Sequence, residues 1–248
     1  MTQAIFYKHL KYWVDPDKKK EPFCFARFED RHVVATNGHC MLVTTNWQVT
    51  EPHYEDVNGQ VVDCEAQFPD YKRHVIDLDD AAWSYTEVAP FGGRYGMIPR
   101  WRAFLDYVRK GCKIPGCSYP PTIILQRRRN YLLAYYCNEL TRSMTVLKDD
   151  LRHGTMEEMH DWQGAYNAEY LFHAFDLLRD TKPGMVSIGV NRQELPQFFI
   201  HTKDLYIVIS GVRFKWDEDE GFYGPARRIW RAANDLPDLK ETSDMLGA

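Results

Sequence analysis

Metal binding and catalysis both depend on the spacing of cysteine, histidine and acidic side chains. Cys112 and Cys117 lie close together in a Gly/Pro loop, but no second pair of ligands stands at the spacing of a zinc ribbon. His153, His160 and Asp161 share a polar segment, again without the fixed spacing typical of metal ligands. We therefore expect no metal ion and no other cofactor.

Sequence motifs that would support catalysis are absent. The sequence has no phosphate-binding loop ending in Gly-Lys-Ser/Thr, no Gly-x-Ser-x-Gly and no His-Glu-x-x-His. The glycine-rich stretch at 92–96 precedes Pro99, a residue typical of a helix start, and lacks the lysine of a nucleotide site. We expect a protein that is not an enzyme. The alternative is an enzyme that uses the cysteine- and histidine-containing loops.

The composition is that of an ordinary globular protein. With 248 residues, 44% hydrophobic and 27% charged, the chain is long enough for one large domain or two ordinary ones. Its formal net charge of −4 means that any nucleic-acid contact must come from a local basic patch. Cys24, Cys40 and Cys137 lie in apolar runs typical of buried thiols. Without a signal segment or a run of 18 apolar residues, we expect a cytoplasmic protein with reduced thiols and no membrane contact.

The clearest structural signal is a β-hairpin at residues 32–45. Two β-branched runs, 33–36 and 41–45, flank the dipeptide Asn37-Gly38. This dipeptide tolerates positive φ better than most others, so it readily closes a tight turn between antiparallel strands. The pattern therefore predicts a hairpin with a two-residue turn.

A helix followed by three strands is predicted three times along the chain. The helices are expected at 4–14, 99–110 and 168–179. The strands are expected at 23–28, 33–36, 41–45, 83–89, 122–126, 131–137, 143–147, 185–189, 198–201 and 205–211. Because each unit is too small to bury its own sheet face, neighbouring units must share a core. The sequence therefore predicts an α+β fold of tandem β-α-β-β-β units, with helices on one face of antiparallel sheets.

Three short motifs have counterparts in one protein family. Residues 34–41 read Val-Ala-Thr-Asn-Gly-His-Cys-Met, 68–73 read Phe-Pro-Asp-Tyr-Lys-Arg, and 166–171 read Tyr-Asn-Ala-Glu-Tyr-Leu. In the same order, they resemble the Val-Ala-Thr-Asp-Gly-His-x-Leu signature, the Phe-Pro-Asp-Tyr-Arg-Arg linker and the Phe-Asn-x-x-Tyr-Leu helix of the bacterial DNA polymerase III beta subunit, the sliding clamp. The resemblance is concentrated in residues 24–75 and 165–214, and the tandem units are that family's building plan.

The resemblance implies a reduced clamp architecture. A bacterial clamp has three domains of two units each, whereas this sequence supplies three units in all. The unit expected before the linker is replaced by residues 47–67, which are too few to form another. We expect a truncated clamp-like domain with its linker at 1–80, a complete clamp-like domain of two units at 81–214, and a tail with a short helix (225–236) at 215–248. Four copies would supply twelve units for a ring.

Clamps of this family meet DNA through their helices, which line a channel and contact phosphates through lysine and arginine. The resemblance assigns DNA binding to cations of the first two predicted helices: Lys8, Lys11, Arg100, Arg102, Arg109 and Lys110. For each cation the alternative is an ordinary solvated helix face. The densest basic cluster, residues 127–129, is predicted in a hairpin turn, where it could touch DNA or protect a sheet edge.

A second surface implied by the resemblance is a pocket for short linear motifs of partner proteins. In clamps it is lined by the signature hairpin, the linker and the last strand. The corresponding residues here are Thr36, Gly38, His39, Met41, Pro69, Arg73, Ile207 and Ile209. Two features depart from the family: Cys40 replaces its arginine, and Ile209-Ser210-Gly211 replaces its closing Met-Pro-Met. The alternative role for these residues is packing between units.

The function implied by the resemblance is that of a processivity factor. Such a protein tethers a DNA polymerase or another replication protein to double-stranded DNA and raises its effective concentration at the template. We would then expect a homo-oligomer, a partner that binds through a short linear motif, and room for a clamp loader. The alternative keeps the fold without the ring: a clamp-like interaction module that binds or competes for replication proteins.

Overall fold

The computed structural model describes residues 1–74, 83–88, 96–111, 121–128, 131–138, 143–150, 162–191 and 197–212. Several predicted features lie outside these residues: the Cys112 and Cys117 loop, the His153, His160 and Asp161 segment, residues 92–95, Arg129 and the tail helix at 225–236. The domain limits drawn from the sequence stay predictions.

In the described part of the chain, each of three helices precedes three strands. The first unit holds α1 (Gln3–Leu10), β1 (Ala26–Glu29), β2 (His32–Thr36) and β3 (Cys40–Thr44), followed by β4 (His53–Glu55), β5 (Val61–Val62) and the short 3-10 helix η1 (Tyr71–His74). The second holds β6 (Trp83–Val88), α2 (Met97–Gly111), β7 (Thr122–Arg128), β8 (Tyr131–Asn138) and β9 (Ser143–Asp150). The third holds β10 (Trp162–Asn167), α3 (Ala168–Thr181), β11 (Val186–Asn191), β12 (Phe198–Thr202) and β13 (Leu205–Ile209). The predicted α+β repeat is confirmed.

The first helix is shorter than the sequence pattern predicted. It begins where the Thr2 hydroxyl accepts a hydrogen bond from the Ile5 N–H at 3.4 Å, and it ends at Leu10 instead of residue 14. The chain then turns, with the Trp13 N–H donating to the Leu10 carbonyl at 2.9 Å, so Trp13 still reaches the core. No helix in the described residues is long and apolar enough to cross a membrane.

The second and third units exchange their first strands. One sheet has the order β10-β7-β8-β9, so the third unit supplies β10 to the strands of the second. The other sheet contains β6-β11-β12-β13, so the second unit supplies β6 to the strands of the third. All these neighbours pair antiparallel. The exchange ties the two units together, and neither sheet is built from one unit alone.

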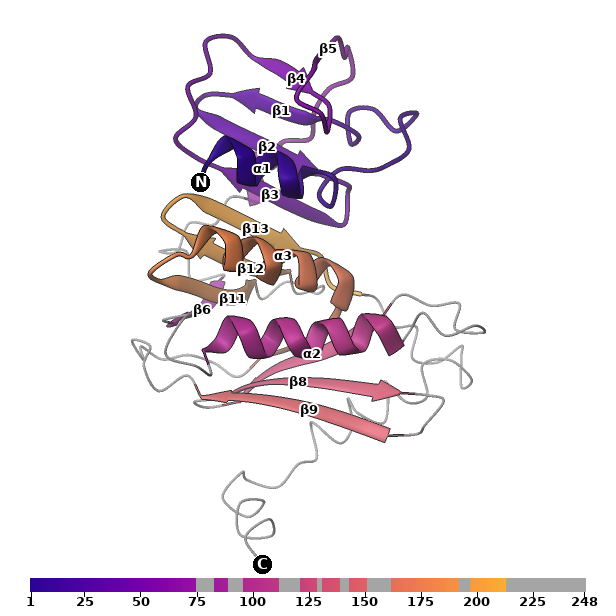
Figure 1. The fold of residues 1–248 in the computed structure, drawn as a ribbon, viewed down its shortest axis with the longest axis vertical. Helices are drawn as coiled ribbons and strands as arrows, with labels where there is room; N and C mark the ends of the chain where they lie inside the picture. The colour runs from indigo at the N-terminus through magenta and orange to yellow at the C-terminus, as the bar shows by residue number, and fades with distance from the viewer. Residues whose placement is uncertain are drawn as a thin grey trace, which may run out of the picture.

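In the first unit, the position of the exchanged strand is occupied by a strand of the same unit. Its sheet has the order β5-β4-β1-β2-β3, and β4 pairs antiparallel with β1 where an exchanged strand would lie in the other sheets. Residues 47–67 are too few to form another unit. They form the β4–β5 hairpin, which occupies this edge of the sheet in place of a strand from a neighbouring unit (Figure 1).

The first and third units join edge to edge. Strands β3 and β13 pair antiparallel over five residues, which makes one nine-stranded sheet, and the three helices cover one face of the molecule side by side (Figure 1). Between helices and sheets lies the main core, where Trp13, Trp101 and Phe175 are fully buried and the Trp101 ring stacks on Phe175 at 5.4 Å. A smaller apolar cluster lies on the other face of the β3–β13 junction.

Candidate functional site

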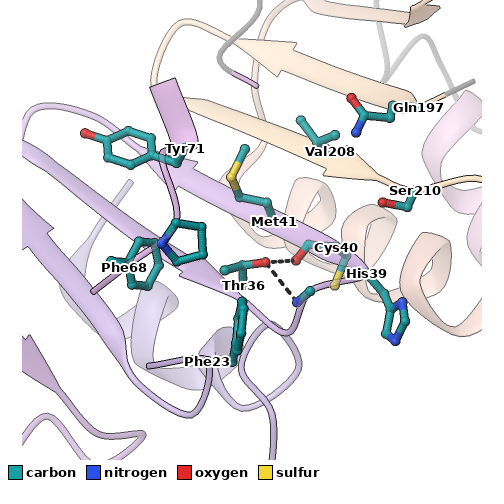
Figure 2. A pocket seen from close by; sticks show the side chains of 12 residues that line it. Phe23, Thr36, His39, Cys40, Met41, Phe68, Tyr71, Gln197, Val208 and Ser210 are labelled. Atoms are coloured by element: carbon teal, nitrogen blue, oxygen red, sulfur yellow. Dashed lines mark hydrogen bonds between the residues drawn. The ribbon is translucent and has the colours of Figure 1, made fainter. Parts of the chain in front are cut away.

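A pocket of about 320 Å³ opens on the outer face of the nine-stranded sheet, at the junction of the first and third units (Figure 2). It receives side chains from the β2–β3 hairpin, from the segment that leads into η1, from β13 and from the residues just before β12 and just after β13. The lining residues are Phe23, Thr36, Gly38, His39, Cys40, Met41, Phe68, Pro69, Tyr71, Gln197, Val208 and Ser210.

The hairpin loop is held by its own side chains. The Thr36 hydroxyl donates to the Cys40 carbonyl at 2.8 Å and accepts from the Gly38 N–H at 3.1 Å. The Asn37 side-chain oxygen accepts from the N–H groups of His39 at 2.9 Å and Cys40 at 3.0 Å. The loop has three residues between the strands, not the two expected, and Gly38 takes a φ of +84° that suits glycine. The rim of the pocket is therefore preformed.

The alternation of side chains decides which residues of β13 reach the pocket. In the β3–β13 register Met41 lies opposite Val208, and both point to the outer face. Ile207 and Ile209 point the other way and are 0% exposed in the main core. Ile207 and Ile209, assigned to the pocket from the resemblance, thus lie in the core, and Val208 and Ser210 line the pocket.

The segment before η1 forms the aromatic wall of the pocket. The Tyr54 hydroxyl donates to the Ala66 carbonyl at 3.0 Å, and its ring contacts Phe68 at 6.2 Å, so the segment is fixed against the first unit. Tyr71 packs with Met41 in the outer cluster, and burial raises the pKa of its hydroxyl to about 12. Arg73 lies in η1, and its side chain is outside the described residues.

The polar groups at the pocket are suited to recognition rather than to reaction. Burial raises the pKa of the Cys40 thiol to about 12, so it stays protonated and a poor nucleophile at neutral pH. His39 is exposed at the rim, with its ring stacked on Tyr170 at 6.4 Å. An apolar floor with a few polar groups at its edge is typical of a site that accepts apolar side chains of a ligand.

Five of the eight residues assigned from the resemblance line the pocket: Thr36, Gly38, His39, Met41 and Pro69. Sequence reasoning missed the aromatic residues Phe23, Phe68 and Tyr71. Phe68 and Tyr71 stand inside the linker motif, so their place next to Pro69 was an available signal. Gln197 precedes β12 and had no comparable signal.

Five of the six predicted DNA-binding cations lie on α1 and α2, and each of these five pairs with a carboxylate; Lys11 follows the end of α1. Lys8 pairs with Asp180 at 2.6 Å and Arg102 with Asp176 at 2.5 Å, each across two helices. Lys11 differs, since its ammonium lies 5.0 Å from the ring centroid of Tyr12. These pairs offset part of the positive charge along the contact between α1, α2 and α3.

The other three cations are paired in the same way. Arg109 donates to Asp106 at 2.8 Å and to Glu169 at 3.3 Å, and Lys110 pairs with Asp106 at 2.5 Å. Arg100 pairs with Asp149 of β9. Arg127, expected in a turn, lies in β7 and is buried, so it is not part of an exposed basic turn.

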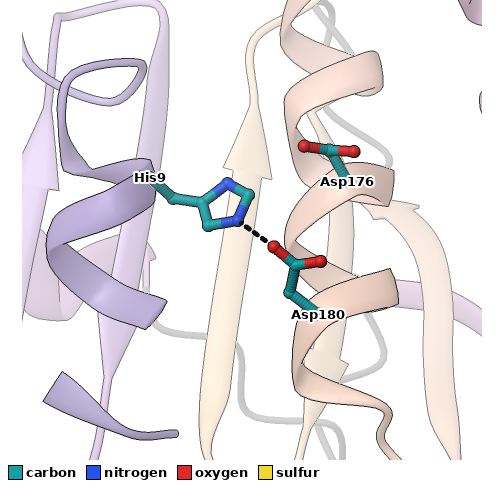
Figure 3. A group of neighbouring side chains, drawn as sticks. All are labelled: His9, Asp176 and Asp180. Carbon is teal, nitrogen blue, oxygen red and sulfur yellow. Dashed lines mark hydrogen bonds and ion pairs between the residues drawn. The ribbon is translucent and has the colours of Figure 1, made fainter. Parts of the chain in front are cut away.

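His9, Asp176 and Asp180 form the tightest group of potential metal ligands in the described residues (Figure 3). The His9 Nε2 lies 2.8 Å from Asp180, but Arg179 reaches both carboxylates, at 3.1 and 3.0 Å. Burial lowers the pKa of His9, an effect that Asp180 partly offsets. With cations already on both carboxylates, this group is better described as an ion-pair network that joins α1 to α3.

Sequence comparisons give no relative: no protein-family model matches the chain. No curated protein matches it either. Solved structures do match. The chain resembles the DNA polymerase III beta subunit of Pseudomonas aeruginosa with a TM-score of 0.61 at 11% identity, over 84% of this chain and 63% of that one.

Two further structures agree with this comparison. The beta subunit of the Streptococcus pyogenes DNA polymerase matches with a TM-score of 0.61 at 11% identity, and the sliding clamp of Bartonella birtlesii with 0.61 at 13%. Each match covers 85% of this chain and 63% of the other, so the chain spans less than two thirds of these proteins. The chain has the fold of the DNA polymerase III beta sliding clamps, in a divergent form.

Proposed function

We propose that the chain is a non-catalytic, clamp-like module that captures a replication protein through a short apolar segment bound in the pocket. The observation that carries this proposal is the preformed pocket at the β3–β13 junction, where the Thr36 and Asn37 side chains fix the rim. A preformed site loses little conformational entropy on binding, which favours recognition of a flexible segment.

The pocket suits a segment with one or two large apolar side chains. Met41, Val208 and Phe68 offer apolar surface, and Thr36, His39 and Ser210 stand where a peptide backbone could find hydrogen-bond partners. Burying one Leu or Phe side chain contributes roughly 1.5–3 kcal/mol. Two such side chains would support binding in the micromolar range once ordering costs are subtracted.

The experiment that tests the proposal is a binding titration with a fluorescent peptide of the form Gln-x-x-Leu-x-Leu-Phe, the motif that binds related clamps. We expect saturable binding by fluorescence anisotropy, with a dissociation constant of about 1 to 100 µM. A peptide with the same composition and the leucines and phenylalanine separated by charged residues serves as control. Equal binding of both peptides, or of neither, would contradict a motif-specific pocket.

A second candidate function, tethering to double-stranded DNA, is favoured by the cations of α1 and α2, because these helices lie on one side of the sheets (Figure 1). These cations include Lys8, Arg102, Arg109 and Lys110. Their carboxylate partners weaken the field that a phosphate backbone would meet. Retention on circular but not linearised DNA would support a closed tether. If the protein dissociates from both circular and linearised DNA at moderate salt, the tethering function is contradicted and the pocket remains the proposed functional surface.

Replacing Asp106 with asparagine is expected to strengthen DNA binding if the helix surface meets DNA. Lys110, together with Arg109, lowers the pKa of Asp106, so this carboxylate is ionised at neutral pH. Asp106→Asn removes its charge and leaves Arg109 and Lys110 without that partner. We expect affinity for a DNA duplex to rise about two- to fivefold at about 50 mM salt, with a smaller gain at higher salt.

Asp63→Asn is the matched control, because it removes the same charge from an exposed position just beyond β5. Filter binding or anisotropy with a labelled duplex measures both variants over a salt series. An equal gain for both variants would mean that net charge alone sets the affinity, and that the helix surface has no special role.

A further inference from the structure

Two histidines are buried where the first unit meets the third on the helix side of the molecule. The side chain of His9, on α1, is 1% exposed, and that of His173, on α3, is 9% exposed. Tyr12 lies between them: its ring stacks on His173 at 3.8 Å and lies 6.3 Å from the ring of His9. The contact between α1 and α3 thus contains a row of three rings, two of which are imidazoles.

Only one of the two ring nitrogens of His9 has a partner in the described residues. The Nε2 atom lies 2.8 Å from a carboxylate oxygen of Asp180, whereas the Nδ1 atom is buried without a hydrogen-bond partner there. Since an ionised carboxylate only accepts, the neutral ring carries its proton on Nε2. Protonation of His9 would place a second N–H at Nδ1, and a buried donor without an acceptor destabilises the folded state.

The carboxylate that faces His9 is already held by two cations. Lys8 lies 2.6 Å from Asp180, and the guanidinium of Arg179 lies 3.0 Å from it. Burial raises the pKa of Asp180, but the hydrogen bonds that this carboxylate accepts outweigh burial and lower the pKa, so it is ionised at neutral pH. Lys182 lines the same end of the contact as Lys8 and Arg179. A charged His9 would therefore meet an anion whose charge is already compensated.

The second carboxylate near His9 is paired as well. Asp176 lies 2.5 Å from the guanidinium of Arg102 on α2 and 3.1 Å from that of Arg179 (Figure 3). Cations thus outnumber the two carboxylates before His9 takes up a proton. Protonation would add one more positive charge at a site from which water is largely excluded, and like charges repel more strongly there than in water.

The other end of the row is fixed to α3. The Nε2 atom of His173 lies 3.2 Å from Glu169, and Arg109 of α2 pairs with the same carboxylate at 3.3 Å. The Nδ1 atom of His173 is also buried without a partner in the described residues. The stack of Tyr12 on His173 thus holds the turn after α1 against α3, next to the bond that His9 makes.

We propose that the α1–α3 contact is a pH-sensitive joint between the first and third units, closed while His9 is neutral and loosened when His9 is protonated. The direction follows from the surrounding cations and from the unpartnered Nδ1, because the ring accepts a proton more readily once α1 has separated from α3 and water reaches it. Strands β3 and β13 pair independently of His9, so we expect a local opening of α1 and not a separation of the two units.

The pKa of His9 sets the pH range of this opening. Burial lowers the pKa of His9, and the attraction of Asp180 offsets only part of that effect. Neutral His9 therefore supports the joint fully above about pH 6.5, the ordinary pKa of histidine. This support is lost as the pH falls from that value toward the lower pKa of the folded state. The proposal does not depend on what the pocket binds.

Hydrogen exchange of the hydrogen-bonded α1 amides in the full chain, at about pH 7.5 and about pH 5, tests the proposal. After correction for the intrinsic pH dependence of exchange, we expect α1 to open about 3- to 30-fold more often at the lower pH. The upper limit is the proton-binding factor of a free histidine. His9→Gln keeps a side-chain N–H for Asp180 but cannot take up a proton, so α1 should open equally often at both pH values.

His201→Gln is the matched control. Burial lowers the pKa of His201 as well, but this histidine lies on β12 opposite Tyr206, which packs against the apolar cluster on the other face of the sheet. The variant should keep the wild-type pH dependence of α1 opening. The proposal would be overturned if this control lost the dependence, if His9→Gln kept it, or if α1 of the wild type opened equally often at both pH values.

An NMR titration of the assigned His9 ring in the wild-type protein needs no variant. We expect the ring to titrate below about pH 6.5, together with shifts of the α1 backbone signals. A His9 ring that titrates at or above this pH would overturn the proposal even if His9→Gln failed to fold. Motif-peptide binding by folded His9→Gln at about pH 7.5 should equal that of the wild type, so failure of the joint and failure of the pocket can be told apart.

Discussion

Phe68→Ala is expected to weaken binding of the motif peptide about 30-fold or more. Phe68 stands between two apolar clusters and lines the pocket together with Met41 and Val208. Aromatic residues at the centre of a binding site commonly contribute 2 kcal/mol or more, and each 1.4 kcal/mol corresponds to about a tenfold change in affinity. The measurement is the anisotropy titration with the labelled peptide.

Tyr12→Ala is the matched control for this change. Tyr12 is also an aromatic side chain of intermediate exposure, but it stacks on His173 at 3.8 Å on the helix side of the sheet. Its removal should change peptide affinity less than about twofold, because it makes no contact with the pocket lining. If Phe68→Ala binds the peptide as tightly as the wild type, the pocket is not the peptide site. If both variants weaken binding equally, the effect is one of global stability.

The hairpin of the pocket was predictable because its information is local. Asn37 and Gly38 fix the loop through hydrogen bonds within a few residues, and such signals are visible in a short stretch of sequence. The choice between the two faces of β13 was not local. Its five residues read Leu-Tyr-Ile-Val-Ile, apolar on both faces, so the period of two is hidden and only the register with β3 assigns Val208 to the outside.

The exchange of β6 and β10 between units could not be predicted, and neither could the pairing of β4 with β1. Both depend on contacts between segments that are separated in the sequence. Strand β4 has three residues and β5 two, which is below the length at which alternation can be recognised. The turn between them did carry a local signal: the Asp56 carboxylate accepts from the N–H groups of Asn58 and Gln60, and Gly59 has a φ of +78°. That signal predicts a hairpin but does not predict the sheet with which the hairpin pairs.

The ion pairs of the helix surface could not be predicted from the sequence for a similar reason. Lys8 and Arg102 stand on helices with few acidic neighbours in sequence, but their partners Asp180 and Asp176 come from α3, more than 70 residues further along the chain. A cation count along each helix therefore overstates the field of the assembled surface. The pocket depends less on such distant pairing, because the loop that forms its rim is fixed by its own residues.

Trp101→Ala is expected to lower the free energy of unfolding by about 3–5 kcal/mol, the cost of a large cavity in a close-packed core. Trp101 is 0% exposed, and its ring lies nearly parallel to Phe175, so it joins α2 to α3. Its indole N–H also donates to the buried Asp149 of β9. The Trp101 side chain thus links α2 to α3 and, through Asp149, links α2 to the four-stranded sheet. Urea unfolding followed by circular dichroism measures the change.

Trp101→Phe separates the two contributions of this side chain. Phenylalanine keeps most of the stacking on Phe175 but cannot donate to Asp149, so a loss of about 1–3 kcal/mol is expected. Trp47→Phe is the matched control, because Trp47 is only partly buried against Phe6 and Phe28 and should lose less than about 1 kcal/mol. Equal losses for Trp101→Phe and Trp47→Phe would contradict a role for the Asp149 bond. A Trp101→Ala variant as stable as the wild type would contradict the packing between α2 and α3.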